Sequence, residues 1–281
     1  NWQLNAITND TNHFAVDSTI ITLMKVDESN IWQSATGSIG IQTKINAKSE
    51  LSFNFDYLYY RNDNPSGYRG DSFYKEDDLH DDSEIDLTKK TPIQFLIAKA
   101  DYQYRVSTSF SWETGIKAVT SMLDNNVLVK RNVSNKWITD SAFTSFSVLN
   151  ESTGAFYVSL KWNRKQWQVN GGLRYEYTHT TIETANERNL VNRKYGYFFP
   201  GFTIRRDLDT ETDFQFSYFR RITRPTYNDM APYVFFWGPN TFSGGNTALY
   251  PAITDALTAS YHIKQYIISM EYTNTQNKIV S

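Results

Sequence analysis

Hydrophobic and polar residues alternate along ten windows of the chain. In one window, apolar Leu51, Phe53 and Phe55 alternate with polar Ser52 and Asn54. A period of two places the apolar side chains on one face of a strand and the polar ones on the other. The pattern therefore predicts about ten β-strands, at residues 39–45, 51–59, 96–104, 110–118, 156–162, 167–177, around 202, 214–218, 257–261 and 266–272.

Charged residues occupy only the polar face of these windows, although they make up 21% of the chain. The other face therefore meets strictly apolar surroundings. In a soluble sandwich these surroundings are a second sheet, and in a membrane barrel they are lipid, while the polar face lines a wet lumen. The ten charged residues are Lys44, Asp56, Lys99, Asp101, Glu113, Lys117, Lys161, Arg174, Glu176 and Glu271.

The connections between the windows alternate between short and long. The short ones are 46–50, 105–109, 163–166, 207–212 and 262–265, and the long ones are 62–93, 120–154, 179–194 and 222–254. This alternation is typical of an up-and-down barrel with short turns at one end and long loops at the other. We therefore predict an all-β fold, an antiparallel up-and-down transmembrane β-barrel, over residues 36–281. Residues 1–35 are expected to form a loop plus a possible strand, and the whole chain to be part of a larger barrel.

Aromatic residues gather at both ends of the predicted strands, as expected for the two membrane interfaces. The alternative explanation is the ordinary enrichment of aromatic residues in strands. Tyr104, Phe110, Trp112, Trp162, Trp167, Tyr261 and Tyr266 flank short turns, and Tyr57, Tyr59, Tyr175 and Tyr177 lie at the opposite strand ends.

The last long connection has no charged side chain between Met230 and Thr254, yet it cannot be a membrane helix. Pro225, Pro232 and Pro251 are among the four prolines that forbid a regular helix across it. We predict an extracellular loop that packs on itself, contacts a ligand, or does both. The candidate ligand contacts are its aromatic residues, Tyr227, Tyr233, Phe235, Phe236, Trp237 and Phe242.

Composition excludes several other classes of protein. The chain has no cysteine, and therefore neither a disulfide scaffold nor a cysteine metal site. Its net charge of −2 makes nucleic acid an unsuitable partner. No catalytic motif is present, so no enzyme activity and no cofactor are predicted. The segment 71–86 carries eight carboxylates, which favours a solvated loop over a calcium site because the spacing lacks the calcium-loop pattern.

Residues 93–281 resemble the barrel of TonB-dependent outer-membrane receptors of the Bacteroidetes type. The stretches 168–180 and 198–204 resemble two strands of that family. The most specific element begins with Arg220 and Arg221 at a strand end and closes at the next strand. Its residues are Arg220, Arg221, Ile222, Arg224, Pro225 and Tyr227, then Gly245, Asn246, Leu249 and Pro251.

This resemblance implies a barrel of about twenty-two strands, plugged by an N-terminal domain, in the bacterial outer membrane. It implies uptake of an unidentified nutrient powered through the TonB protein. The plug and the TonB-contacting segment are not found in this chain. Two other classes stay open: a non-transporting barrel acting as adhesin or assembly scaffold, and a soluble β-sandwich binding module.

The charged residues of the predicted lumen face have two possible roles. They pair with one another, or they face a plug or a substrate, because a charge removed from water needs a partner. These lumen-facing candidates are Lys99, Asp101, Glu113, Lys117, Arg174 and Glu176.

Overall fold

The protein is described by a computed structural model that covers residues 2–14, 18–74, 79–231, 234–236 and 242–279. Almost every element is a β-strand. The strands are β1 (Trp2–Phe14), β2 (Ser18–Asn46), β3 (Ser49–Tyr74), β4 (Leu79–Arg105), β5 (Phe110–Val133), β6 (Lys136–Thr139), β7 (Ser145–Arg164), β8 (Trp167–Thr184), β9 (Val191–Asp207), β10 (Thr212–Thr223), β11 (Val234–Phe236), β12 (Phe242–Gly244), β13 (Ala252–Ile263) and β14 (Tyr266–Gln276). One short helix, α1 (Tyr227–Met230), lies between β10 and β11.

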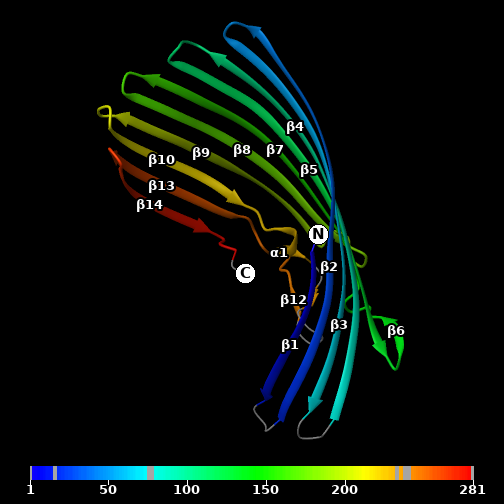
Figure 1. The fold of residues 1–281 in the computed structure, drawn as a ribbon. Coiled ribbons are helices and arrows are strands. Elements are labelled where there is room, and N and C mark those ends of the chain that lie inside the picture. Colours follow the sequence, from blue (N-terminus) through cyan, green and yellow to red (C-terminus); the bar gives the residue numbers. More distant parts are fainter. Residues whose placement is uncertain (1, 15–17, 75–78, 232–233, 237–241, 280–281) are drawn as a thin grey trace.

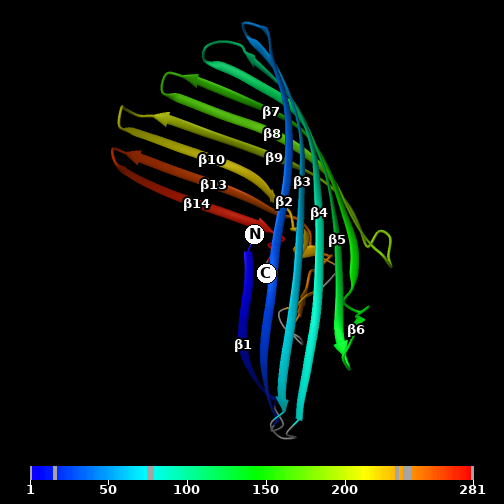
Figure 2. The same cartoon turned by 45° about the vertical axis from the view of Figure 1, so that its right-hand side comes forward.

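Twelve of these strands form one antiparallel sheet in which sequence neighbours pair side by side. The order is β1-β2-β3-β4-β5-β7-β8-β9-β10-β13-β14, with β6 paired to β5, and β11 and β12 form a separate hairpin. The sheet curls into part of a barrel wall (Figure 1; Figure 2). This arrangement confirms the predicted all-β, up-and-down topology and contradicts the sandwich, because one continuous sheet takes the place of two packed sheets.

All ten predicted windows lie in strands, but the strands run further than the alternation predicts. β3 and β4 continue through most of 62–93, and β5 and β7 through most of 120–154. β8 and β9 likewise shorten the expected loop at 179–194, and β1 and β2 fill most of 1–35. The short turns lie where expected, since β2 ends at Asn46 and β3 begins at Ser49.

Strand register places the apolar and the charged side chains on opposite faces of the sheet. Lys99 lies opposite Lys117, while the adjacent Ala100 lies opposite Ile116. Since opposite residues in an antiparallel pair share a face, the two sets separate across the whole wall. On the apolar face, large side chains stay exposed, 68% for Ile39 and 59% for Ile116.

The described residues between 224 and 251 (224–231, 234–236 and 242–251), called here the inward segment, lie on the hollow side of the curled sheet (Figure 1). This segment carries α1, β11 and β12. Two apolar clusters join this segment to the sheet. Their residues on β4 and β5 share a face with Lys99 and Lys117, so the charged residues lie on the concave face. Ala231 packs with Val26, Tyr68, Ile85, Leu87, Val127 and Val129, and Met230 packs with Leu123, Leu149, Ile182 and Val191.

Among the described residues, no helix is long and apolar enough to cross a membrane.

Candidate functional site

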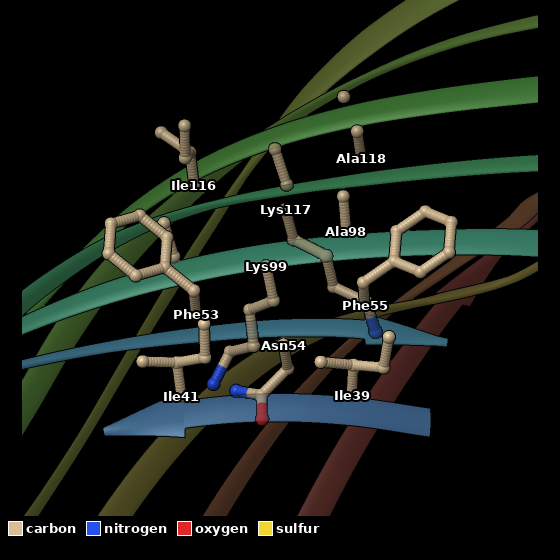
Figure 3. Close-up of a pocket in the computed structure, with 13 residues that line it drawn as sticks. Ile39, Ile41, Phe53, Asn54, Phe55, Ala98, Lys99, Ile116, Lys117 and Ala118 are labelled. Carbon is tan, nitrogen blue, oxygen red and sulfur yellow. The ribbon is translucent and has the colours of Figure 1, made fainter. Parts of the chain in front are cut away.

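The convex face carries an apolar groove of about 630 Å³. Figure 3 shows Ile39 and Ile41 of β2, Phe53 and Phe55 of β3, and Ile116 of β5 around the small side chains of β4 and β5. The aromatic residues of the predicted girdles lie on this same face. Tyr104 and Trp112, for example, are opposite one another in register, with ring centroids 5.9 Å apart.

The concave face holds a chain of polar contacts that begins on β4. Lys99 pairs with Asp101, with Nζ 2.8 Å from Oδ2. The Tyr157 hydroxyl of β7 donates a hydrogen bond to the same carboxylate across the intervening strand β5. That reach requires a glycine, because a Cβ at Gly115 would lie 2.5 Å from the Tyr157 hydroxyl and 2.6 Å from Asp101 Oδ1. The guanidinium of Arg174 lies over the Tyr157 ring, 5.7 Å from its centroid.

Arg224 continues this chain from the end of β10. Glu176 accepts from Arg174 Nε at 2.5 Å and from Arg224 Nη2 at 2.7 Å. Arg224 also donates to Thr178 Oγ1 at 3.1 Å and lies 3.9 Å from Glu151. The Glu176 side chain is only 12% exposed, so its two arginines hold it as a desolvated carboxylate. Arg224 therefore fastens the start of the inward segment to the barrel wall.

The helix α1 follows directly and is held at its N-terminal end. Thr226 caps it, since its side chain accepts from the Asp229 amide while the Asp229 side chain accepts from the Thr226 amide. The Tyr227 hydroxyl hydrogen-bonds the Ser147 hydroxyl at 2.7 Å. Burial raises the pKa of Tyr227 to about 12, which keeps this hydroxyl neutral.

The far end of the inward segment is held by backbone contacts. Arg193 donates to the carbonyl oxygens of Thr247 and Leu249. The Asn246 amide donates to the Asp229 carbonyl at 2.6 Å. Gly245 lies so close to α1 that a Cβ there would approach the Ala231 backbone nitrogen to 2.4 Å. The inward segment is therefore held in the lumen at both of its ends.

The predicted ligand-contact residues lie at different places between residues 224 and 251, and two of them are not described. Tyr227 lies inside the segment, and its hydroxyl contacts Ser147 of the wall strand β7. Phe235 and Phe236 form β11, and Phe242 begins β12. Tyr233 and Trp237 lie outside the described residues.

The residues of the family-like element mostly hold the inward segment. Arg224, Gly245 and Asn246 make the contacts given above, and Pro251 is fully buried. Pro225 is partly buried between Arg224 and the capping threonine. Arg221 differs, because its guanidinium lies over the Phe219 ring at 5.6 Å.

The six predicted lumen-facing residues share the concave face, but only four form ion pairs. Lys99 pairs with Asp101 and Arg174 with Glu176. Glu113 and Lys117 make no ion pair within the described part of the chain. Sequence reasoning missed four residues that complete the network, because nothing near them in sequence marks them as partners: Ser147, Glu151, Tyr157 and Arg193.

The acidic stretch 71–86 forms the outer ends of β3 and β4, apart from 75–78, which are not described. Across the described ranges, no three histidine, cysteine or acidic side chains gather in a metal-binding group.

Comparison with known proteins agrees with this geometry. A curled antiparallel sheet with an apolar convex face and a polar lumen defines an outer-membrane β-barrel. The model of the outer membrane protein beta-barrel family matches residues 43–281, and the chain belongs to that family. The protein therefore lies in a bacterial outer membrane, with the convex face of its sheet toward lipid.

Solved structures resemble the chain at low sequence identity. The copper transporter OprC has a TM-score of 0.53 at 11% identity, with 98% of this chain and 51% of that chain covered. The ferric yersiniabactin uptake receptor FyuA from Yersinia pestis has a TM-score of 0.48 at 9% identity, with 98% and 52% covered. The chain thus spans about half the length of these structures. A search of curated protein sequences found no match.

Proposed function

We propose that this chain forms part of the barrel wall of a TonB-dependent transporter, which takes up a small nutrient across the outer membrane. Its partners are membrane lipid, a plug domain that fills the lumen, and TonB. The observation that carries the proposal is the concave face. It holds a network of partly buried charges together with a chain segment that lies in the lumen, and both suit contact with a plug or a ligand. The fold shared with a copper transporter supports transport.

The inward segment is the proposed ligand-facing element at the extracellular mouth. Its first end is held by Arg224 and Tyr227 and its second end by Arg193. The part between them is therefore attached to the wall at both sides. This part contains the hairpin of β11 and β12. We assign ligand contact to the aromatic residues in and around this hairpin, Tyr233, Phe235, Phe236, Trp237 and Phe242.

Two measurements on the full-length protein test this function. In a planar lipid bilayer, a plugged transporter shows no steady conductance until urea unfolds the plug, whereas a passive barrel conducts at once. In energised cells, formaldehyde cross-links a transporter to TonB, and the cross-link is lost when the proton gradient is collapsed. Immediate steady conductance together with no TonB cross-link contradicts the proposal and favours a passive or scaffolding barrel.

A further inference from the structure

The concave wall contains a recess of about 370 Å³ between β7, β8, β9 and β10. Two glycines opposite one another in register, Gly172 and Gly201, form its floor. Neither has a side chain, so neighbouring side chains can approach the strands closely at this point. A Cβ at Gly201 would come within 2.8 Å of the Phe219 ring, which shows that the ring lies against this floor.

Aromatic rings and cations surround the floor. Tyr157, Phe199 and Phe219 line the recess, and so do Lys161 and Arg174. No carboxylate lines it. The recess thus combines aromatic walls with two cations, of which Arg174 is already paired with Glu176.

The two cations differ in their pairing. The Lys161 side chain has no hydrogen-bond or ion-pair partner within the described part of the chain. Arg174 gives its Nε to Glu176, which lies outside the recess. An unpaired lysine beside the rings favours an anionic occupant.

We propose that this recess binds a small organic acid, with the carboxylate at Lys161 and a flat apolar body against the rings. The volume lies within the range of small-molecule sites. The aromatic faces suit a planar apolar group. This inference rests on the proposed uptake function and deepens it, because it names a chemical class of cargo that meets the wall on its way through the lumen.

The probe is 4-fluorobenzoate, observed by fluorine NMR line broadening with the full-length protein purified in detergent. We expect saturable binding, and binding about tenfold weaker for the neutral isostere 4-fluorobenzamide. Lys161→Gln should weaken 4-fluorobenzoate binding about tenfold, because it removes the unpaired cation of the recess. Lys117→Gln is the matched control: it removes another lumen-facing lysine without an ion pair, outside the recess, and should leave binding unchanged.

A second variant guards against indirect effects of charge. Phe219→Ala removes a ring but no charge, and should also weaken binding, with heat-modifiable gel migration confirming the fold. Three results overturn the recess assignment: no saturable binding, equal binding of the amide, or an unchanged affinity in Lys161→Gln. A recess already filled by the plug gives the first of these. Binding needs no energised membrane, so binding without a TonB cross-link would overturn the proposed uptake and leave the recess standing.

Discussion

Replacing Arg224 by alanine should release the inward segment from the barrel wall while leaving the sheet intact. The side chain is 26% exposed and donates to Glu176 at 2.7 Å and to Thr178 at 3.1 Å. A hydrogen bond to a charged group contributes about 1.5–3 kcal/mol. Glu176 keeps its second partner, Arg174, so its carboxylate does not become an unpaired buried charge. We therefore expect the segment to lose about 2 kcal/mol, roughly thirtyfold in its opening equilibrium.

Amide hydrogen exchange of the full-length protein in detergent measures this opening directly. The reporters are the Asn246 amide, bonded to the Asp229 carbonyl at 2.6 Å, and the Met230 amide, bonded to the Thr226 carbonyl at 3.3 Å. Both should exchange roughly thirtyfold faster in Arg224→Ala, in proportion to the loss of about 2 kcal/mol.

The matched control is Arg220→Ala, because Arg220 lies four residues earlier, in β10, and pairs with Asp255 instead, with Nε 3.1 Å from Oδ1. It should leave the reporter amides unchanged. Unchanged exchange in Arg224→Ala would refute the anchoring role. Equal acceleration across the whole sheet would refute it too, because the effect would then be global.

Three further predictions follow from single positions. Gly115→Ala should destabilise the barrel by about 1–3 kcal/mol, because its Cβ would meet Tyr157, whereas Gly154→Ala, with nothing within 4 Å, should not; the temperature of the heat-modifiable gel shift compares them. Ile116→Arg should cost about 2–4 kcal/mol if the convex face meets lipid, and a cost near zero in urea-unfolding in lipid vesicles contradicts that orientation. Tyr227 has a pKa of about 12 in the folded protein and about 10 in the unfolded chain. It therefore stabilises the fold below pH 10, and this contribution is lost as the pH rises from about 10 to about 12. An alkaline stability curve of the wild type that matches that of Tyr227→Phe would refute this.

The sequence predicted the membrane-facing part of the fold well, because lipid imposes the period-two pattern that the sequence carries. It did not predict how far the strands continue. On β3, Arg61 and Asp63 lie on the same face as Phe53, so this face becomes charged beyond the apolar band and the alternation ends. There the backbone ladder and side-chain hydrogen bonds, such as Asn62 to Asn30 at 2.6 Å, hold the strands together.

The contacts of the site were less predictable than its residues. Arg224 stood out in the family-like element, and Glu176 in the alternation, but they lie 48 residues apart and no local pattern joins them. Tyr157 gave no signal, because its partner is reached across β5 over a glycine whose role is visible only in three dimensions. Only the register of the strands in the sheet shows which of these side chains lie next to one another.

The convex face should meet lipid, and the concave face should meet a water-filled or plug-filled lumen. The chain has no cysteine, so single cysteines at the adjacent positions Ile116 and Lys117 of the full-length protein can each carry an environment-sensitive fluorophore. In lipid vesicles, spin-labelled acyl chains should quench the label at position 116 strongly and the label at 117 weakly. Equal quenching at both positions, or the reverse order, would contradict the account.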